Sequence, residues 1–329
     1  MAHQIAGLAM NAAVMYSFTA PPRYGTFDDP VAGEGEQIVK VRAAGLHQVV
    51  KARASGQHYT SSHELPLVPG VDGVGVLEDG SRVYFGATRP RLGTFAERTI
   101  TARWICTPLP DALDDVTAAG IANPAMSSWA ALRIKGLAAG KESVLILGAT
   151  GTAGQLAIQI AKRLGARRVV AAGREPNALE RLKSLGADAT ISLQLDHDAL
   201  VAAFRREMDD DAIDVVLDYI WGPPAEAFLA AVAQRGENNK ATRARYIQVG
   251  SMAGPTITLP AATLRSSGLE MYGSGFGSVE LEDILKSLRE FFQEAAKSPF
   301  RFEPKAAPLR DVEKLWNAPQ QGARIVFQP

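Results

Sequence analysis

The segment 144–154, with the sequence VLILGATGTAG, constrains the fold of this chain more than any other. Its four consecutive branched apolar residues predict a strand that is buried on both faces, as in a parallel sheet. Three glycines then follow at a spacing of three. Beyond them, apolar residues recur at helical period up to Gly165, which is placed to end the helix. A strand, a glycine-rich turn and a helix in this order predict a binding site for a pyrophosphate at the helix N-terminus.

The length and composition indicate a two-domain protein that does not bind nucleic acid or an anionic membrane. The chain has 329 residues, and its Lys plus Arg and Asp plus Glu balance at 35 each, so no net charge favours nucleic acid or anionic lipid. Its single cysteine, Cys106, excludes an intramolecular disulfide and a cysteine-rich metal site. The N-terminus lacks the pattern of a signal peptide, and no apolar run reaches about 18 residues. We therefore expect a cytoplasmic protein.

The sequence pattern changes near residue 125. Before it, short apolar runs are separated by Gly, Pro and Asp, which is typical of a mainly β domain with tight turns. After it, strand and helix patterns alternate, which predicts an α/β domain with a doubly wound parallel sheet. The end of the chain returns to strand-like sequence. We therefore expect residues 1–124 to be rejoined by 300–329, with 125–299 forming a nucleotide-binding domain between them.

The residues after the second strand of this domain indicate which dinucleotide binds. NAD-binding folds place an acid about twenty residues beyond the glycines, where it binds the ribose 2′-hydroxyl. Gly173 and Arg174 occupy that place here, and a guanidinium can pair with a 2′-phosphate and stack on adenine, so the pattern predicts NADP(H). Asn177 and Arg181 are weaker candidates for the same phosphate, although Arg181 also fits a solvated helix face. Glu175 does not fit this pattern; it could face solvent or pair with a neighbouring Arg.

Signature-like segments lie along the whole chain. They are Ala43–His47, Leu65–Gly75, Gly93–Glu97, Pro124–Leu132, Gly148–Gly154, Leu185–Asp188 and Gly322-Ala323. In this order and at these separations they resemble the zinc-independent medium-chain dehydrogenases/reductases of the quinone oxidoreductase branch. The resemblance implies a GroES-like, mainly β catalytic domain, a Rossmann domain and hydride transfer in the cleft between them. It also implies a homodimer formed through the edge strand of the Rossmann sheet, which we expect to be the sixth strand at 270–272.

The residues at the metal-binding positions of zinc-dependent relatives differ here. Those relatives carry a Cys ligand after a glycine of the first domain and a Gly-His-Glu motif further on. In this sequence His47 stands at the Cys-like position, and Val71, which cannot bind a metal, replaces the His. The five histidines show no ligand spacing. We therefore expect no metal. Without a Lewis acid, alcohol oxidation is disfavoured, whereas a quinone or an α,β-unsaturated carbonyl accepts hydride unaided.

Three residues are candidates for contact with the acceptor. Ser127 stands where the family has a nicotinamide-contacting Thr; it could bind the carboxamide or the substrate oxygen, or be satisfied by the preceding helical turn. Tyr59, where the branch often has a Tyr, could orient or protonate the acceptor oxygen, or simply pack. His47 could line the pocket with Tyr59. Asp72 fits a role in fixing the local backbone or a neighbouring Arg better than the role of a base.

The predicted cofactor-binding residues come from the glycine turn, the end of the second strand and the loops after the fifth and sixth strands, where such sheets bind ligands. They are Gly148, Ala149, Thr150, Gly151, Thr152, Ala153, Gly154, Gly173, Arg174, Asn177, Val249, Gly250, Ser251, Gly273, Ser274 and Gly275.

Three functions are compatible with these residues. The first is NADPH-dependent, metal-independent hydride transfer to a small-molecule quinone or similar conjugated carbonyl. The second is reduction of an enone or an enoyl thioester; a carrier-bound thioester would need a basic entrance, which Arg89, Arg91 and Arg301 could supply. The third is a non-catalytic dinucleotide-binding protein with a structural or redox-sensing role. We expect neither a nucleic-acid nor a membrane partner.

Overall fold

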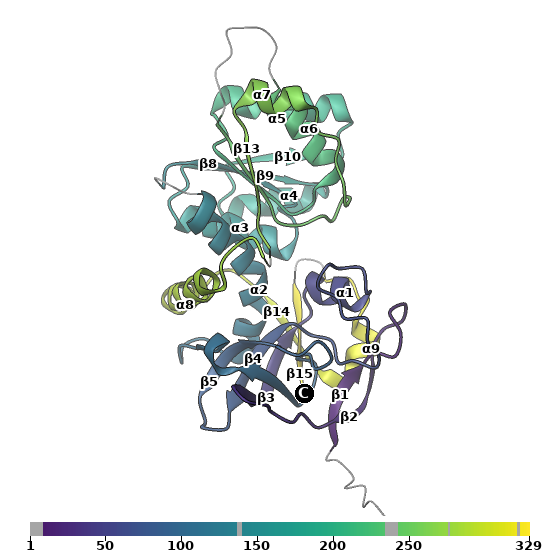
Figure 1. Cartoon of the computed structure of the whole chain (residues 1–329). Coiled ribbons are helices and arrows are strands. Elements are labelled where there is room, and N and C mark those ends of the chain that lie inside the picture. The colour runs from purple at the N-terminus through teal and green to yellow at the C-terminus, as the bar shows by residue number, and fades with distance from the viewer. Residues whose placement is uncertain (1–8, 137–139, 234–242, 276, 321–322) are drawn as a thin grey trace, which may run out of the picture. The chain divides into compact units, whose positions relative to one another are not determined.

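The computed structural model describes residues 9–136, 140–233, 243–275, 277–320 and 323–329 (Figure 1). It divides into two compact units, one made of Met1–Asn123 with Leu288–Pro329 and one made of Pro124–Ser287. Helices α2 (Asp115–Ala131) and α8 (Leu281–Lys297) carry residues of both units. Within the described ranges, no helix has the length and apolar character needed to cross a membrane.

The first unit is built mainly from strands. These are β1 (Ala9–Val14), β2 (Arg23–Asp28), β3 (Glu36–Gly45), β4 (Asp72–Leu77), β5 (Arg82–Gly86), β6 (Arg98–Ala102), β7 (Thr107–Pro108), β14 (Pro304–Pro308) and β15 (Arg324–Gln328), with the short helices α1 (Gln48–Ala54) and α9 (Val312–Leu315). Strands β14-β15-β3-β4-β5-β7 form one sheet, in which β6 also pairs with β3, and β1 and β2 form a separate hairpin.

The last strand of the chain belongs to this first sheet. Strand β15 runs antiparallel to β3, with Val326 opposite Gly45 and Phe327 opposite Ala44. The Phe327 ring packs edge-on against Phe95, at 5.2 Å between ring centroids, in the core of the unit. The closing strand therefore completes a hydrophobic core that is formed by residues 10–96 together with Ala307, Leu309, Val312 and Trp316.

The second unit is a parallel sheet with helices on both faces (Figure 1). Its elements are β8 (Ser143–Leu147), α3 (Thr152–Arg163), β9 (Arg168–Gly173), α4 (Pro176–Leu182), β10 (Ala189–Ser192), α5 (His197–Asp210), β11 (Val215–Asp218), α6 (Gly222–Val232), β12 (Arg245–Gln248), α7 (Ala261–Ser267) and β13 (Glu270–Gly273). The strand order is β10-β9-β8-β11-β12-β13. The predicted α/β class, with a mainly β part and a doubly wound parallel sheet, is confirmed.

The strand order has a switch point between β8 and β11. From β8 the chain winds outward through β9 and β10, and it then returns to the other side of β8 with β11, β12 and β13. Ligands of open α/β sheets bind at the carboxyl ends of the strands beside such a point. Strand β13 lies at the edge of the sheet, as its sequence position predicted.

The central strand and the helix after it form as their sequence predicts. Every residue of β8 is buried, which explains its unbroken apolar run. In α3 the buried side chains include Leu156, Ala157, Ile160 and Ala161, which share the face that packs on the sheet. Gly165 follows the helix with φ +93°, a conformation that favours glycine.

Candidate functional site

The glycine turn after β8 packs tightly at both ends and is open in the middle. Gly148 has φ +88°, and a Cβ atom there would lie 2.8 Å from Ile220 Cγ2. A Cβ on Gly154 would lie 2.5 Å from the Gly148 carbonyl oxygen. By contrast, a Cβ on Gly151 would meet nothing closer than 3.6 Å. Gly148 therefore lets the turn pack against the loop after β11, Gly154 lets helix α3 rest on the turn, and Gly151 leaves space above the turn.

Helix α3 points its positive end into this space. The first N–H groups of a helix have no acceptor within the helix, and its dipole favours negative charge at that end. Gly151, at the N-cap, has no side chain to cover these donors, and the first turn of α3 contains no acidic residue. The turn is itself held by Gly148 and Ala149, whose N–H groups both donate to the Ala172 carbonyl, at 3.0 and 2.9 Å. This arrangement fits a pyrophosphate group.

The end of β9 provides a cation beside the turn. Arg174 is exposed and has no carboxylate partner among the residues that the structure describes. Glu175, which did not fit the NADP(H) pattern, caps helix α4: its carboxylate accepts the N–H groups of Asn177 (3.1 Å) and Ala178 (2.5 Å). Arg181 Nη2 lies 4.0 Å from the same carboxylate. The acid is thus engaged with its own helix, and Arg174 is left available.

The loops after β11 and β12 pack backbone against backbone. The N–H groups of Val249 and Gly250 both donate to the Asp218 carbonyl, at 2.7 and 3.0 Å, and Ala253 N–H donates to the Ile220 carbonyl at 2.6 Å. A Cβ atom on Gly250 would lie 2.6 Å from the Tyr219 carbonyl oxygen. The predicted cofactor segment 249–251 is therefore held in a fixed position relative to the end of β11.

A buried carboxylate organises the same loop. Asp218 accepts hydrogen bonds from the N–H groups of Ile220 (2.8 Å) and Trp221 (2.9 Å) and from the Tyr246 hydroxyl (2.6 Å). Burial raises the pKa of Asp218, although these hydrogen bonds oppose the shift. Burial and the neighbouring carboxylate together hold the pKa of Tyr246 well above its usual value.

Trp221 adopts a backbone conformation that is almost confined to glycine. Its φ of 56° and ψ of −156° lie in a region that costs other residues about 1–3 kcal/mol. Such strain persists only when the surroundings enforce it, here through Asp218 and the loop after β12. No pattern in the sequence indicates this residue, because the restraint comes from the loops that follow two different strands.

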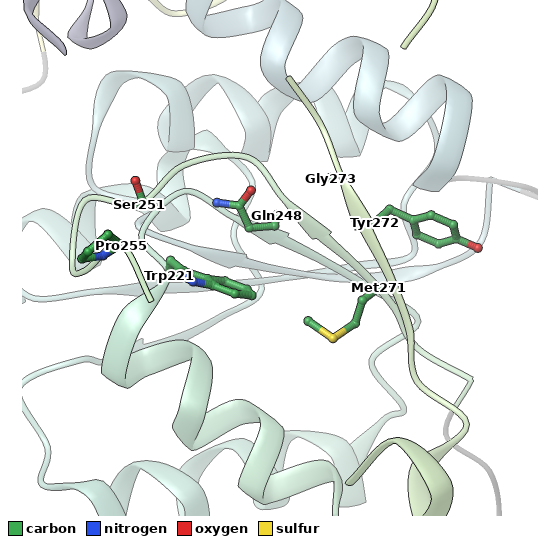
Figure 2. Close-up of a pocket in the computed structure, with 7 residues that line it drawn as sticks. All are labelled: Trp221, Gln248, Ser251, Pro255, Met271, Tyr272 and Gly273. Atoms are coloured by element: carbon green, nitrogen blue, oxygen red, sulfur yellow. The ribbon is translucent and has the colours of Figure 1, made fainter. Parts of the chain in front are cut away.

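A pocket of about 450 Å³ lies at the carboxyl ends of β11, β12 and β13 (Figure 2). It includes two of the predicted cofactor residues, Ser251 and Gly273. The other lining residues were not predicted; they are Trp221, Gln248, Pro255, Met271 and Tyr272. The alternation of side chains along β12 and β13 predicts to which face of the sheet Gln248 and Met271 point, but it does not predict that both lie near Trp221.

Ser127 lies in the second unit, on helix α2. Its Oγ is 2.7 Å from the Pro124 carbonyl oxygen and 3.2 Å from the Tyr219 hydroxyl. The first contact is the bond to the preceding helical turn that the sequence left open as an alternative. Burial raises the pKa of Tyr219 to about 12, so its hydroxyl stays protonated at neutral pH. Ser127 and Tyr219 thus form a neutral hydrogen-bonded pair.

The other two acceptor candidates lie in the first unit. His47 is buried, with Nε2 3.3 Å from Asp72 Oδ1, and Tyr84 donates a 2.5 Å hydrogen bond to Asp72 Oδ2. Tyr59 is 71% exposed, and its ring lies against that of His58, with 4.3 Å between the ring centroids and 30° between the ring planes. In the described ranges, no group of three or more His, Cys, Asp or Glu side chains is arranged to hold a metal ion.

Comparisons with known proteins agree with this fold. The family model described as "Zinc-binding dehydrogenase" matches residues 153–294. A probable NADPH-dependent quinone reductase (tdiC) of Emericella nidulans is 29% identical, and the match covers 97% of this chain and 100% of that protein. A quinone oxidoreductase of Lama guanicoe is 27% identical over 81% of this chain and 77% of its own.

Solved structures show the same fold. The quinone oxidoreductase of Pseudomonas syringae has a TM-score of 0.83 at 21% identity, and that of Thermus thermophilus, solved alone and in complex with NADPH, has 0.77 at 24%. Each match covers 97% of this chain and 100% of the other.

These similarities support the expected place of the chain among the medium-chain dehydrogenases/reductases, in their zinc-independent quinone oxidoreductase branch. The segment that matches the zinc-binding dehydrogenase model contains neither His47 nor Val71, which are the positions where zinc-dependent relatives carry ligands.

Proposed function

We propose that this protein is an NADPH-dependent oxidoreductase that transfers hydride, without a metal, to a quinone or a similar conjugated carbonyl. The observation that carries the proposal is the open glycine turn at the start of α3, beside an exposed cation, Arg174, that has no carboxylate partner in the described residues and stands where NAD-binding folds place an acid. Full-length similarity to a probable NADPH-dependent quinone reductase supports it.

The residues of the second unit would bind and orient the cofactor. The N–H groups at the glycine turn would hold the pyrophosphate, and Arg174 and Asn177 the 2′-phosphate. Backbone groups of residues 249–251 and 273–275 would hold the carboxamide. When bound, NADPH supplies the hydride. The main contribution of the protein would then be to position the reactants and exclude water, which can lower the activation free energy by about 7–11 kcal/mol. Ser127 would bind the carboxamide or the substrate oxygen, Tyr59 would orient or protonate the acceptor oxygen, and His47 would line the pocket with Tyr59.

A second acceptor class has support from particular relatives. A 2-methylene-furan-3-one reductase of Solanum lycopersicum is 33% identical over 49% of this chain, and an NADPH-dependent alkenal/one oxidoreductase of Arabidopsis thaliana is 31% identical over 58%. Enones accept hydride at a carbon conjugated to a carbonyl, so the same site chemistry serves both acceptors. Enone reduction is therefore the alternative activity.

We also propose the domain organisation, the location and the oligomeric state of the protein. Residues 1–124 with 300–329 would form the GroES-like catalytic domain, and 125–299 the NADP-binding domain. The protein would act in the cytoplasm on a small molecule. It would form a homodimer through β13, because an edge strand leaves unpaired backbone groups that a second copy can pair with.

The test is NADPH oxidation by the purified protein with a panel of quinones and enones, with NADH in a parallel series. We expect turnover that prefers NADPH and requires no added metal. A preference for NADH, or stoichiometric zinc in elemental analysis, would contradict the proposal. Tight NADPH binding without turnover on any acceptor would favour the non-catalytic, redox-sensing alternative.

A further inference from the structure

The loop that follows β13 consists largely of glycine and serine. Residues 273–278 have the sequence Gly-Ser-Gly-Phe-Gly-Ser. A Cβ atom on Gly273 or on Gly277 would meet nothing within 4 Å, so both positions leave the backbone open to an approaching ligand. A glycine-rich segment loses more backbone entropy on ordering than other sequences do. A ligand of this loop would therefore bind weakly unless other contacts already held the loop in place.

One ammonium group bonds both ends of this loop. Lys135 Nζ donates to the Gly273 carbonyl at 2.8 Å and to the Ser278 carbonyl at 3.2 Å. The same ammonium lies 5.8 Å from the centre of the Tyr272 ring, which extends away from Trp221 in Figure 2. An ammonium carries three donors, so one side chain can bond two carbonyl groups at once. Lys135 therefore fixes the distance between the two ends of the loop.

The position of Lys135 depends on an unusual turn. It belongs to a π-helical turn, Leu132–Gly136, that follows helix α2 and contacts β12. Wide turns of this kind are rare, and they are frequent at functional sites. In the described residues the hydrogen bonds of the ammonium go to the two loop carbonyls and to no carboxylate. Its charge is therefore directed at the loop backbone, where it strengthens both bonds.

The loop is restrained at two further points. Ser274 N–H donates to the carbonyl of the last residue of β12 at 2.8 Å. Ser278 Oγ accepts the Gly275 N–H at 2.8 Å, and Ser278 N–H donates to the Gly275 carbonyl at 3.1 Å. Residues 273–275 are therefore held by β12, by Ser278 and by Lys135, while both of their glycines stay exposed.

We propose that Lys135 is a positioning residue for the nicotinamide end of NADPH. Its ammonium holds the two ends of the loop, so the backbone of 273–275 has its binding conformation before the cofactor arrives, which lowers the entropic cost of binding. Lys135 acts through the loop and not by touching the cofactor. The inference rests on the proposed function, which assigns contacts with the carboxamide to 249–251 and 273–275, and it adds a residue from outside those segments.

The test compares two ligands of the full-length protein by calorimetry. One is NADPH; the other is adenosine 2′,5′-bisphosphate, which has the 2′-phosphate but no nicotinamide. Lys135→Met removes the ammonium and nearly keeps the length of the side chain. We expect it to weaken NADPH binding roughly tenfold and to leave binding of the bisphosphate unchanged. Damage to the whole unit would weaken both ligands alike. Unchanged NADPH affinity, or an equal loss for both ligands, would overturn the proposal.

A matched control and a second variant complete the test. Lys162 Nζ also donates to a backbone carbonyl, that of Arg167 at 3.4 Å, and it pairs with Asp188 at 2.6 Å. It lies at the end of helix α3 that is remote from the glycine turn, so Lys162→Met should bind both ligands like the wild type. If Lys135→Met does not fold by circular dichroism, Lys135→Gln replaces it with the same expected results, because an amide lacks the charge and the reach of the ammonium.

The outcomes for Lys135 and for the proposed function are distinguishable. The affinities are measured without an acceptor, so a wild type that binds NADPH but reduces no quinone or enone would contradict only the proposed turnover. A wild type that oxidises NADPH, together with a Lys135→Met variant that binds it normally, would contradict only the role of Lys135. A wild type that does not bind NADPH would overturn both.

Discussion

The Tyr246 hydroxyl donates a 2.6 Å hydrogen bond to the carboxylate of Asp218, and both side chains are fully buried. The same carboxylate accepts two backbone N–H groups of the loop that carries Trp221. One acid therefore connects the core between β11 and β12 to the wall of the pocket. Burial disfavours its charged form, so the pKa of Asp218 is raised and its ionisation works against folding.

We expect Asp218→Asn to remove a pH-dependent part of the stability. A carboxyl whose pKa is raised by folding stabilises the folded state fully below its ordinary pKa of 3.8, and this contribution is lost as the pH rises through the folded pKa. The wild type should therefore gain stability relative to Asp218→Asn as the pH falls from neutral toward 3.8. The free energy of unfolding should rise by about 1.4 kcal/mol for each unit by which folding raises the pKa of Asp218. Urea unfolding of both proteins across this range measures it, and a difference that does not vary with pH would contradict the expectation.

Gly151 and Gly154 should respond differently to the same change. Gly154→Ala places a methyl group 2.5 Å from a carbonyl oxygen of the turn, so we expect it to lower the free energy of unfolding by about 1–3 kcal/mol or more. Gly151→Ala meets no close atom and has an ordinary φ of −74°, so stability should be kept.

The Gly151 methyl would, however, occupy the space above the turn where the pyrophosphate is proposed to approach the backbone. We therefore expect Gly151→Ala to weaken NADPH binding by roughly tenfold or more in calorimetry while its thermal unfolding stays unchanged. Each variant is the control for the other. Unchanged NADPH affinity in Gly151→Ala would show that the pyrophosphate does not bind above this turn.

Features that depend on local sequence could be predicted. The apolar run of β8, the spacing of the three glycines and the helical period after them specify the strand, the turn and helix α3, and these three elements fix the class of the second unit. The position of β13 at the sheet edge also follows from the order of strand and helix along the chain.

Features that depend on contacts between distant segments could not be predicted. The strain at Trp221 requires Asp218, Tyr246 and the loop after β12 to meet, and no local pattern encodes that meeting. Glu175 is an intermediate case. A carboxylate just before a proline at the start of a helix is typical of an N-cap, so the local sequence around Pro176 contains the explanation for the residue that does not fit NADP(H).

Asp72 has a structural role that a substitution can test. Its carboxylate accepts a hydrogen bond from the Tyr84 hydroxyl. Burial lowers the pKa of Arg324 to about 10, and the nearby charge of Asp72 opposes this shift. Asp72→Asn should therefore destabilise the fold by about 2 kcal/mol in urea unfolding, because a buried charge-assisted hydrogen bond is weakened. Asp79→Asn is the matched control, since Asp79 pairs with Arg103 at the surface, and its unfolding curve should match the wild type. Equal effects of the two variants would exclude a special role for Asp72.

We expect Arg174 to determine the preference for NADPH over NADH in the proposed reaction. Its guanidinium is exposed at the end of β9 and has no acidic partner in the described part of the chain, whereas Arg181 lies 4.0 Å from Glu175. Arg174→Ala should raise KM for NADPH roughly 10- to 100-fold, because it removes a charge-assisted contact with the 2′-phosphate, and should leave KM for NADH unchanged. Arg181→Ala should change KM for NADPH much less, since its charge is already partly neutralised. Equal increases for NADPH and NADH in Arg174→Ala would show that the residue supports the fold of the turn and does not read the phosphate.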